Sequence, residues 1–324
     1  MFRYFYDVAK TFRSEWNPKK TVPSRSKLIV PSNPKHRKTA LVRAYLHSLC
    51  KYWSPNKVLP TNRAVGLRML RSLSKQWKSN TYKQIRNDIQ QPTSMLARFL
   101  NSGVISIRRV WKTLGKRMPA FERQLVWRSF YACRMNAIRC SKWKPQESLT
   151  INEYDSPTWN SIKKGTHWKQ WTEGKTGVPL VDASMRYLRK HGWLHNRLRM
   201  IVASYLTRIL RISWRHGESW FAQLLFDYDA TQNHFGWKGQ ASLSRDSSKY
   251  FRIPNPWLTK YDPNATFIKE NISELKNVDP NTIQSWETKH SQHPNISYPA
   301  PIISDHTSEA KQSIADWKPL YSSS

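Results

Sequence analysis

The apolar residues between positions 193 and 210 recur at steps of three and four, which places them on one face of a helix. Helical spacing continues through most of the chain from about residue 60. The whole chain has only 10 glycines, and little of it alternates with period two. The sequence therefore predicts an all-α fold. The stripe expected to face its core consists of Leu194, Leu198, Ile201, Tyr205 and Ile209.

Several residues predict where helices are interrupted. Pro179 and Gly217 are expected to punctuate the surrounding helices. Residues 276–324 become rich in Pro, Ser and Asn, with a short helix predicted around Glu309 to Trp317. No internal repeat is visible.

The sequence gives little support for the common cofactor-binding and metal-binding motifs. The chain has no GxGxxG or GxxxxGK[ST] sequence, so neither a dinucleotide-binding turn nor a P-loop is indicated. His191 and His195 stand four apart on a predicted helix and could share a metal, but no third ligand has a matching spacing. Surface or capping histidines are the preferred interpretation, and no metal is expected.

The charge of the chain points to a polyanionic partner. Its 54 Lys and Arg against 21 Asp and Glu give a formal net charge of +33, and residues 61–150 hold 19 basic and 3 acidic side chains. Such a field attracts nucleic acid, because neutralised phosphates release counterions. DNA or RNA is the leading partner class, and a ribosome-like or virion-like packaging protein is the alternative. No membrane span is expected, since no apolar run approaches about 20 residues.

The first 59 residues are interpreted as a basic, partly irregular arm. Residues 1–45 carry 11 Lys and Arg and 2 acidic residues, and four prolines break any long helix. An organelle transit peptide and a solvated or DNA-gripping arm both remain open. The three cysteines leave no paired framework, so a reducing compartment is the simpler assumption, but the sequence does not fix the location.

One long stretch resembles a known family. It reads WTEGKTGVPLVDASMRYLRKHGWLHNRLRMIVASYLTRILRISWRHGESWF, followed by LLFDYDATQNHFGW and YFRIPNP. It is similar to the flavin-binding core of the DNA photolyases and cryptochromes, closest to the class I enzymes that repair cyclobutane pyrimidine dimers. TSMLARFLNSGVISIRRVW and QLVWRSFY upstream, and YPAPIISDH downstream, continue the similarity.

The resemblance implies three regions: an arm over residues 1–59, an FAD-binding helical domain over 60–315 and a C-terminal tail over 316–324. The family's antenna domain has no counterpart here, so no antenna chromophore is expected. FAD is the implied cofactor, held by a pyrophosphate-binding side, an arginine–aspartate pair and an amide facing flavin N5. The implied FAD-binding residues are Tyr82, Thr93, Ser94, Leu96, Phe121, Trp127, Arg128, Tyr131, Asn196, Arg199, Asp227, Asp229 and Asn233.

Thr93 and Ser94 also have an interpretation independent of the family. A Thr-Ser pair ahead of Met-Leu-Ala is a good helix N-cap, so these hydroxyls could serve the helix alone.

The resemblance also implies an electron relay of tryptophans. Trp237 and Trp214 match its inner members, and Trp159 is assigned to the outer position by allowing a two-residue insertion before Trp171. Core packing is the alternative for Trp159, since the chain has 16 tryptophans. The expected catalytic set is Trp237, Trp214, Trp159 and Asn233.

The implied lesion pocket matches the family only in part. In repair enzymes the damaged nucleotides are flipped into a cavity beside the flavin. Gln124 stands where dimer-repair enzymes carry a glutamate, and Gly239 replaces a stacking tryptophan. Phe121 and Ala97 replace a usual tryptophan and serine. The implied substrate-binding residues are Arg86, Gln124, Trp127, Asn196, Arg197 and Met200.

Three functional hypotheses remain. The first is light-driven, FAD-dependent repair of pyrimidine dimers in single- or double-stranded DNA. The second is a cryptochrome-like photoreceptor without repair activity, favoured by Gln124 and Gly239 and opposed by Asn233 and the HNRLRM hexapeptide. The third is a nucleic-acid-binding relative that has lost the flavin.

Overall fold

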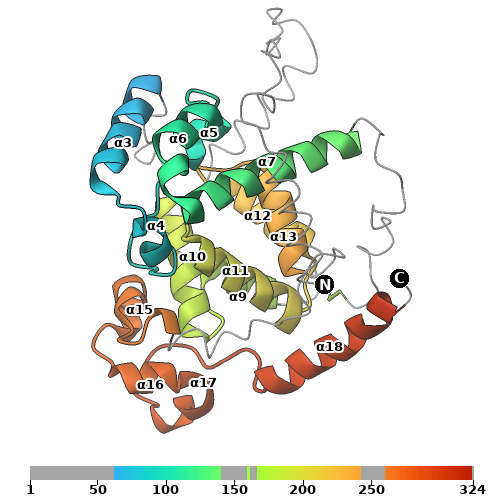
Figure 1. Cartoon of the computed structure of the whole chain (residues 1–324). Coiled ribbons are helices and arrows are strands. Elements are labelled where there is room, and N and C mark those ends of the chain that lie inside the picture. The colour runs from blue at the N-terminus through green and yellow to red at the C-terminus, as the bar shows by residue number, and fades with distance from the viewer. Residues whose placement is uncertain (1–61, 140–158, 161–165, 242–259, 323–324) are drawn as a thin grey trace, which may run out of the picture.

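The computed structural model describes residues 62–139, 159–160, 166–241 and 260–322, so the arm expected over 1–59 lies outside the described residues (Figure 1). The regular elements in these ranges are helices, and the only β pairing is an isolated bridge between Asn160 and Ile212. The all-α prediction is confirmed. The elements are α3 (Arg63–Gln76), α4 (Thr81–Ile85), α5 (Ala97–Asn101), α6 (Ile107–Thr113), η2 (Gly115–Arg117), α7 (Pro119–Arg139), α9 (His167–Glu173), α10 (Pro179–His191), α11 (Asn196–Ser204), η4 (Tyr205–Ile209), α12 (Trp214–Leu224), α13 (Ala230–Gln240), α15 (Thr266–Asn271), η5 (Ser273–Leu275), α16 (Pro280–Gln284), α17 (Trp286–Lys289), η6 (His290–Gln292) and α18 (His306–Ser322).

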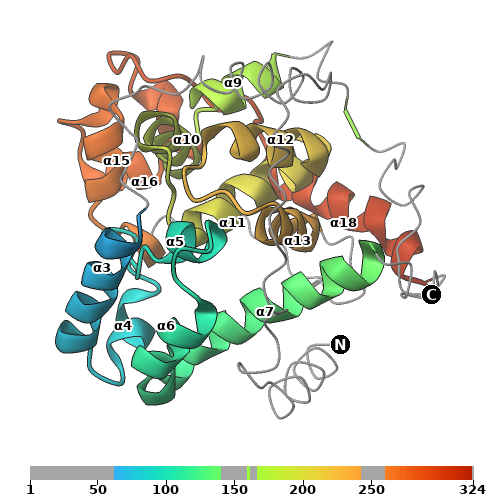
Figure 2. The same cartoon turned by 90° about the horizontal axis from the view of Figure 1, so that it is seen from above.

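Two hydrophobic clusters organise these helices. The smaller cluster joins α3, α5, α6 and the first half of α7 around Phe99, Val110 and Leu114, which are fully buried. The larger cluster joins α9 to α13 with α15 to α18, and Trp171 is fully buried in it. Both views show the long helix α7 running beside α13, where the two groups of helices meet (Figures 1 and 2).

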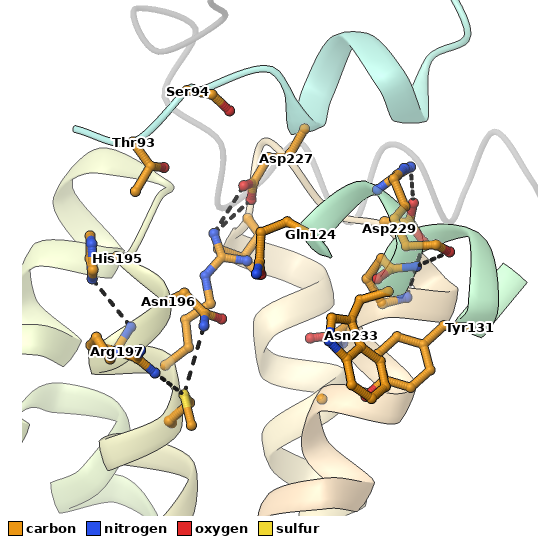
Figure 3. Close-up of a pocket in the computed structure, with 18 of the residues that line it drawn as sticks. Thr93, Ser94, Gln124, Tyr131, His195, Asn196, Arg197, Asp227, Asp229 and Asn233 are labelled. Carbon is orange, nitrogen blue, oxygen red and sulfur yellow. Dashed lines mark hydrogen bonds and ion pairs between the residues drawn. The ribbon is translucent and has the colours of Figure 1, made fainter. Parts of the chain in front are cut away.

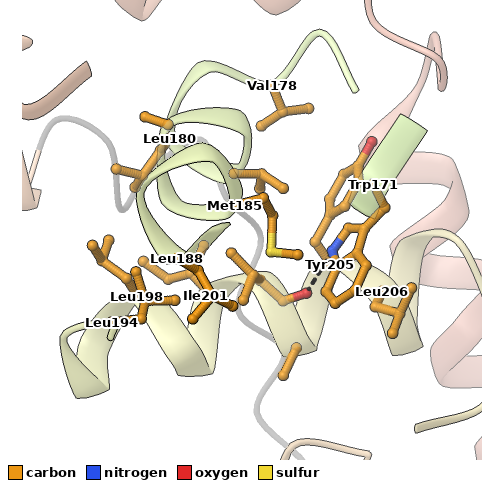
Figure 4. Close-up of a cluster of buried hydrophobic side chains, with 14 of the residues drawn as sticks. Trp171, Val178, Leu180, Met185, Leu188, Leu194, Leu198, Ile201, Tyr205 and Leu206 are labelled. Atoms are coloured by element: carbon orange, nitrogen blue, oxygen red, sulfur yellow. Dashed lines mark hydrogen bonds between the residues drawn. The ribbon is translucent and has the colours of Figure 1, made fainter. Parts of the chain in front are cut away.

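The apolar stripe of residues 193–210 forms the centre of the larger cluster, as predicted. All five of its side chains are at most 3 % exposed (Figure 4). The helix is not uniform, because α11 passes at Tyr205 into a single π-helical turn, η4. The main-chain oxygen of Val202, on α11, accepts a hydrogen bond from Trp171 Nε1 at 3.2 Å. This bond ties α9 to α11 inside the core.

Pro179 begins α10 at its first turn, where its missing N–H costs nothing. Gly192 ends α10 in the left-handed conformation, with φ 65°. The prediction that His191 and His195 share a helix is wrong, because this glycine separates them: His191 closes α10 and His195 caps α11. The described residues contain no group of three potential metal ligands.

Gly217 does not interrupt a helix, contrary to the prediction. It lies inside α12, and a Cβ added there would stand 2.2 Å from Cη2 of Trp237 and 2.8 Å from Cδ2 of Leu206. The glycine is needed because the Trp237 ring packs directly against the α12 backbone. Gly217 thus sets how closely α12 and α13 approach.

The C-terminal part is held to α10 by one buried carboxylate. Asp182 is fully buried and accepts hydrogen bonds from the N–H and hydroxyl of Thr176, the N–H of Gly177 and, at 2.5 Å, the hydroxyl of Tyr298. Burial raises the pKa of Asp182 to about 6, and the hydrogen bonds oppose that shift. The fold therefore depends on a charged group that is fully satisfied.

The last helix, α18, confirms the helix predicted near the C-terminus and is longer than expected. A helix was expected around Glu309 to Trp317, and α18 covers it while running from His306 to Ser322. The helix passes through residue 315, where the domain was expected to give way to a tail. No helix in the part of the chain that the structure describes is long and apolar enough to cross a membrane.

Candidate functional site

A pocket of about 580 Å³ lies between the two hydrophobic clusters. One wall comes from α4, the 93–100 segment and α7, and the other comes from α11, α12, the 225–229 loop and α13 (Figure 3). All but three of the predicted site residues line this pocket. Those that do are Tyr82, Arg86, Thr93, Ser94, Phe121, Gln124, Trp127, Arg128, Tyr131, Asn196, Arg197, Arg199, Met200, Asp227, Asp229, Asn233 and Trp237.

Three predicted residues lie behind the pocket wall. Leu96 is 1 % exposed and packs into the smaller cluster, so a cofactor contact through it stays a prediction. Trp214 begins α12 and is 2 % exposed, and its ring meets His234 edge-on at 5.2 Å. Trp159 is partly buried against the larger cluster, beside the bridge of Asn160 to Ile212.

Two ion pairs fix the acidic side of the pocket. Arg199 contacts both carboxylate oxygens of Asp227 at 3.0 Å, and its Nε donates to the main-chain oxygen of Leu194 at 2.8 Å. Arg128 pairs with Asp229 across the two clusters. Asp229 also caps α13 by accepting from the backbone N–H of Thr231 at 3.1 Å. The two carboxylates are neutralised, so they place side chains without giving the pocket a net negative charge.

Two further guanidinium groups in the pocket have no acidic partner. Arg86 and Arg197 form no ion pair within the described residues. Nε of Arg197 donates to Asn87 Oδ1 at 2.9 Å, and its Nη1 lies 3.5 Å from the Met200 sulfur. Because only neutral groups hold Arg197, its charge is available to an anion. The pocket is therefore electropositive on the side of α4 and the start of α11.

The Thr93 and Ser94 hydroxyls enter the pocket through an unusual backbone turn. Met95 has φ 52°, in the left-handed region that costs a non-glycine residue about 1 kcal/mol. Ser94 Oγ accepts the N–H of Leu96 at 3.4 Å. The N-cap interpretation of this pair is wrong, because α5 starts only at Ala97, with Leu96 at its cap and no side-chain cap bond. Both residues line the cavity instead.

One face of α13 forms much of the floor. Asn233 Nδ2 donates to the main-chain oxygen of Glu218 at 3.1 Å, which leaves Oδ1 as the acceptor. Gln232, Gly236 and Gln240 also line the pocket, and the sequence analysis missed them. Helical spacing from Asn233 could have found Gly236 and Gln240, since positions 233, 236 and 240 share a face.

His195 is a further pocket residue that the sequence did not reveal. It lines the pocket, is 1 % exposed, and its Nδ1 accepts the N–H of Arg197 at 3.2 Å as the cap of α11. Burial, with the charges of Arg197 and Arg199, lowers the pKa of His195 to about 4. The imidazole is therefore neutral at physiological pH.

Aromatic rings line the wall on the α7 side. Tyr82 and Phe121 meet edge-on at 5.2 Å, and burial raises the pKa of Tyr82. Trp127 contacts Tyr131 at 5.6 Å, and Tyr131 stacks on Phe235 of α13 at 5.0 Å with 13° between the rings. These rings give an otherwise polar pocket the flat apolar surface that suits a planar ligand.

Gln124 and Gly239, which depart from the family's lesion pocket, have different surroundings. Gln124 lines the cavity (Figure 3). Gly239 lies one turn beyond Gly236 on α13, and a Cβ at either glycine would meet no atom within 4 Å. Among the described residues, none therefore meets a Cβ at position 239, and Gly239 itself is outside the pocket lining.

Tryptophans continue outward from the pocket. Trp237 is 3 % exposed and contacts Trp171 edge-on at 6.3 Å, and Trp171 stacks on the partly exposed Trp168 at 5.5 Å. Trp214 shares a face of α12 with Gly217, against which the Trp237 ring packs. A series of ring contacts therefore runs from Trp237 through Trp171 to Trp168, which the sequence did not reveal, and the relay through Trp214 stays a prediction.

The groups in this pocket fit FAD. The Thr93 and Ser94 side chains and the Arg128 guanidinium suit the phosphates and ribityl chain, and the aromatic wall suits a ring system. The cavity volume, about 580 Å³, lies within the range of cofactor sites. When bound, FAD would supply electron-transfer chemistry that no side chain offers.

Known proteins similar to this chain include DNA photolyases and a cryptochrome. A deoxyribodipyrimidine photo-lyase of Buchnera aphidicola is 40% identical over 240 residues, which cover 70% of this chain and 48% of that protein. A photolyase structure from Sulfolobus tokodaii with two FAD molecules matches with 31% identity and a TM-score of 0.68, over 82% of this chain and 57% of that one. A Synechocystis cryptochrome, at 24% identity and a TM-score of 0.67, over 79% of this chain and 56% of that one, supports the fold alone.

The chain spans about half the length of the curated relatives that it matches. The sequence profile described as the FAD binding domain of DNA photolyase matches residues 121–319. That match covers more than half of the chain, and it confirms the predicted fold and cofactor class. The α4 and 93–100 wall of the pocket lies upstream of the matched range, yet it closes the same cavity. The chain therefore belongs to the DNA photolyase family, of which it carries the FAD-binding domain.

Proposed function

We propose that this chain binds FAD between its two hydrophobic clusters and uses light to split pyrimidine dimers in DNA. The observation that carries the proposal is the convergence in one pocket of the implied flavin-binding and lesion-binding residues, drawn from segments over 100 residues apart such as Arg128 and Asp229. The bound cofactor, in its reduced form, would supply the electron that opens the dimer and would recover it afterwards.

The chain's own residues have distinct roles in this proposal. Asn233 would offer its Oδ1 to the N–H of the reduced ring system, since its amide nitrogen is held by Glu218. Arg199, fixed by Asp227, would place a positive charge beside the ring. Arg128 and the two hydroxyls at positions 93 and 94 would hold the phosphates and ribityl chain.

The lesion would enter beside the flavin from the α7 and α11 side. Trp127 supplies a flat surface for a flipped base, and Arg197 supplies a charge for its phosphate. Asn196 and Met200, one turn apart on α11, complete that side. Gln124 can hydrogen-bond the bases but cannot donate an acidic proton, so we expect slower splitting than in an enzyme with glutamate there.

The relay to the solvent would begin at Trp237, which touches the pocket. Trp214 would be the second member and Trp159 the third, because Asn160 pairs with Ile212 just before α12 and brings residue 159 close to its start. The relay would return the bound flavin to its reduced, active state by drawing electrons from external thiols. The indoles serve as stepping points for the electron.

The test is the absorption spectrum of the purified protein, followed by blue-light illumination with a thiol reductant and an oligonucleotide containing a thymine dimer. We expect a yellow protein that photoreduces and restores the thymines. The Trp237→Phe variant, given a chemical reductant instead, should repair normally and fail only in photoreduction. A colourless protein that cannot be reloaded with FAD would refute the proposal.

A cryptochrome-like photoreceptor is the second candidate. The open space at Gly239 favours it, because that position offers no ring to hold the second base of a dimer. A yellow protein that photoreduces but leaves the dimer intact would establish it. The Gln124→Glu variant separates the two candidate functions further. Repair by this variant alone would show that the chain lacks only the carboxylic acid at position 124.

A further inference from the structure

His234, which follows Asn233 on α13, stands beside a tryptophan of the proposed relay. Its ring meets the indole of Trp214 with 5.2 Å between the centroids and 74° between the planes. The indole is buried, at 2 % exposed, whereas 28 % of the His234 side chain is exposed. His234 is not among the residues that line the pocket. An imidazole that solvent protons can reach therefore contacts a buried ring of the relay from outside the pocket lining.

A carboxylate on α12 fixes this imidazole. Nδ1 of His234 lies 3.2 Å from Oε1 of Glu218, whose side chain is 22 % exposed. Glu218 follows Trp214 by four positions on α12, so the carboxylate and the indole lie on one face of that helix. Both views show α12 and α13 side by side, and the pair spans them (Figures 1 and 2). Glu218, His234 and Trp214 thus form one cluster between the two helices.

The two polar groups of Glu218 serve different neighbours. Its main-chain oxygen accepts a hydrogen bond from Asn233 Nδ2 at 3.1 Å, and its carboxylate pairs with His234. A change confined to the side chain of Glu218 therefore leaves the contact to Asn233 in place. The role of the carboxylate can be tested without disturbing the amide that lines the pocket.

Other charged side chains near this cluster belong to α7, α12 and α13. The guanidinium carbon of Arg215, on α12, lies 5.9 Å from the centre of the neighbouring indole ring. Arg134, on α7, stands over the ring of Phe235 at 5.2 Å, and Lys238 lies one turn beyond His234 on α13. The arginines of α11 line the pocket instead. Arginine and lysine side chains titrate well above about pH 8, so the imidazole is the group whose charge changes between about pH 5 and about pH 8.

The charge of this cluster matters because an indole that gives up an electron becomes a cation. An anion close to the indole favours that loss, and a further cation opposes it. While His234 is neutral, the pair carries the single negative charge of Glu218. Once His234 is protonated, the pair is neutral as a whole, and its positive member is the one in ring contact with Trp214. A lower pH therefore makes Trp214 harder to oxidise.

We propose that the His234–Glu218 pair makes the tryptophan relay depend on pH by setting how readily Trp214 gives up an electron. The inference rests on the proposed function, since it assumes the step from Trp214 to Trp237. In that step one electron passes from Trp214 to the oxidised Trp237, so Trp237 is reduced and Trp214 becomes a cation that keeps its N–H proton. The external thiol later returns an electron to Trp214. His234 acts through Trp214 and is a positioning residue.

The first test is transient absorption of the indole radical in the FAD-loaded full chain after a pulse of blue light. The thiol is left out, because thiols titrate near the same range. We expect the yield of the radical in the parent chain to fall roughly tenfold from about pH 8 to about pH 5, a modest value for a charge that solvent partly screens. In His234→Asn the yield should not change over this range, since Glu218 keeps its charge.

The Glu218→Gln variant tests the carboxylate separately. It keeps the main-chain oxygen that holds Asn233 and loses the anion. The radical yield should therefore lie below that of the parent chain at each pH, and it should still fall as His234 is protonated. A merely structural role of the pair would change the yield without this dependence on pH.

A matched control removes an imidazole beside a different buried indole. His293 stacks on Trp286 at 6.3 Å with 19° between the rings, and Trp286, in α17, is 2 % exposed. Neither residue lines the pocket. His293→Asn should therefore keep the pH dependence of the parent chain. An equal loss of that dependence in both histidine variants would overturn the proposal, because it would show that the contact with Trp214 is not its cause.

A second test needs no flavin. A protonated imidazole in contact with an indole quenches its fluorescence, so the emission of Trp214 reports the charge of His234 in the full chain without FAD. This emission is the difference between the parent chain and the Trp214→Phe variant. We expect the difference to fall between about pH 8 and about pH 5, and the same difference in the His234→Asn background to stay constant.

The two tests separate this inference from the proposed function. A radical yield that is constant in the parent chain, or one that depends on pH equally in His234→Asn, would overturn the inference while photoreduction and repair stand. A chain that takes up no FAD would refute the proposed function, and the emission then decides the inference. An emission of Trp214 that is independent of His234 overturns it, and one that follows His234 supports the coupling of this charge to the indole.

Discussion

Gly217 and Gly239 form a natural pair for testing how closely α12 and α13 pack. Both are helical glycines, but a Cβ at Gly217 would stand 2.2 Å from Trp237 Cη2, and a Cβ at Gly239 would meet nothing within 4 Å. Alanine at either site gains helix propensity. Only the change at Gly217 also forces a methyl group into an occupied volume.

The cost at Gly217 depends on whether the Trp237 ring can move. That ring is 3 % exposed and is held by Phe221, edge-on at 5.0 Å, and by Trp171 at 6.3 Å. Overpacking of this kind costs about 1–3 kcal/mol, and with no room to relax we expect the upper part of that range. Helix propensity returns up to about 1 kcal/mol, so the net loss for Gly217→Ala is about 1–2 kcal/mol.

Urea unfolding followed by tryptophan fluorescence measures the difference. We expect Gly239→Ala to gain about 0.5 kcal/mol, which puts the two variants about 2 kcal/mol apart in free energy of unfolding. Photoreduction should slow in Gly217→Ala as well, since Trp237 is displaced, and should not change in Gly239→Ala. If both variants unfold at the same urea concentration, the close packing of Trp237 on α12 is refuted.

Three other predictions concern the lesion, the pH and the relay. A Cβ at position 239 meets no atom within 4 Å, so we expect Gly239→Trp to tighten binding of a thymine-dimer oligonucleotide by about 1–3 kcal/mol in a titration, with an undamaged duplex as control. Arg186 holds the pKa of Glu274 at about 2, below its ordinary value, so this pair stabilises the fold above pH 4.5 and loses that effect as the pH falls toward 2. Between pH 4.5 and pH 2 the free energy of unfolding should therefore fall less in Glu274→Gln than in the parent chain, as measured by acid unfolding. We expect Trp214→Phe to slow photoreduction more than Trp171→Phe does. Transient absorption of the indole radical measures both variants, and a larger effect in Trp171→Phe would show that the electron passes through Trp171 instead.

The sequence identified residues on both walls of the pocket. The 193–210 stripe and the residues of α11 and α13 were identifiable because helical spacing and the family resemblance agree there, as for Asn196, Arg199 and Asn233. His195 caps a helix, as the preferred interpretation had it, but its place in the pocket was missed because that place depends on where α10 ends, at Gly192. Propensity does not fix such an end to within a residue or two.

Other features depend on contacts between distant segments. Gly217 looks like a helix break in the sequence, and only the approach of Trp237 shows that it is a packing position. The Thr93–Ser94 pair looks like a cap, but the left-handed turn at Met95 redirects it. In both cases tertiary packing overrides a local rule, and both positions are close to the pocket, where such conflicts are expected.

The cofactor pocket lies between two hydrophobic clusters, so a bound cofactor should affect the stability of the fold. Few polar contacts join the clusters near the cavity, among them Arg128 with Asp229 and Gln232 Nε2 with the main-chain oxygen of Arg128 at 3.1 Å. A ligand that contacts both walls adds to these links and binds the folded state alone. At a concentration 100 times its Kd it would stabilise the chain by about 2.7 kcal/mol. FAD bound in this pocket would therefore stabilise the fold as well as supply chemistry, because the residues that line the pocket come from both clusters.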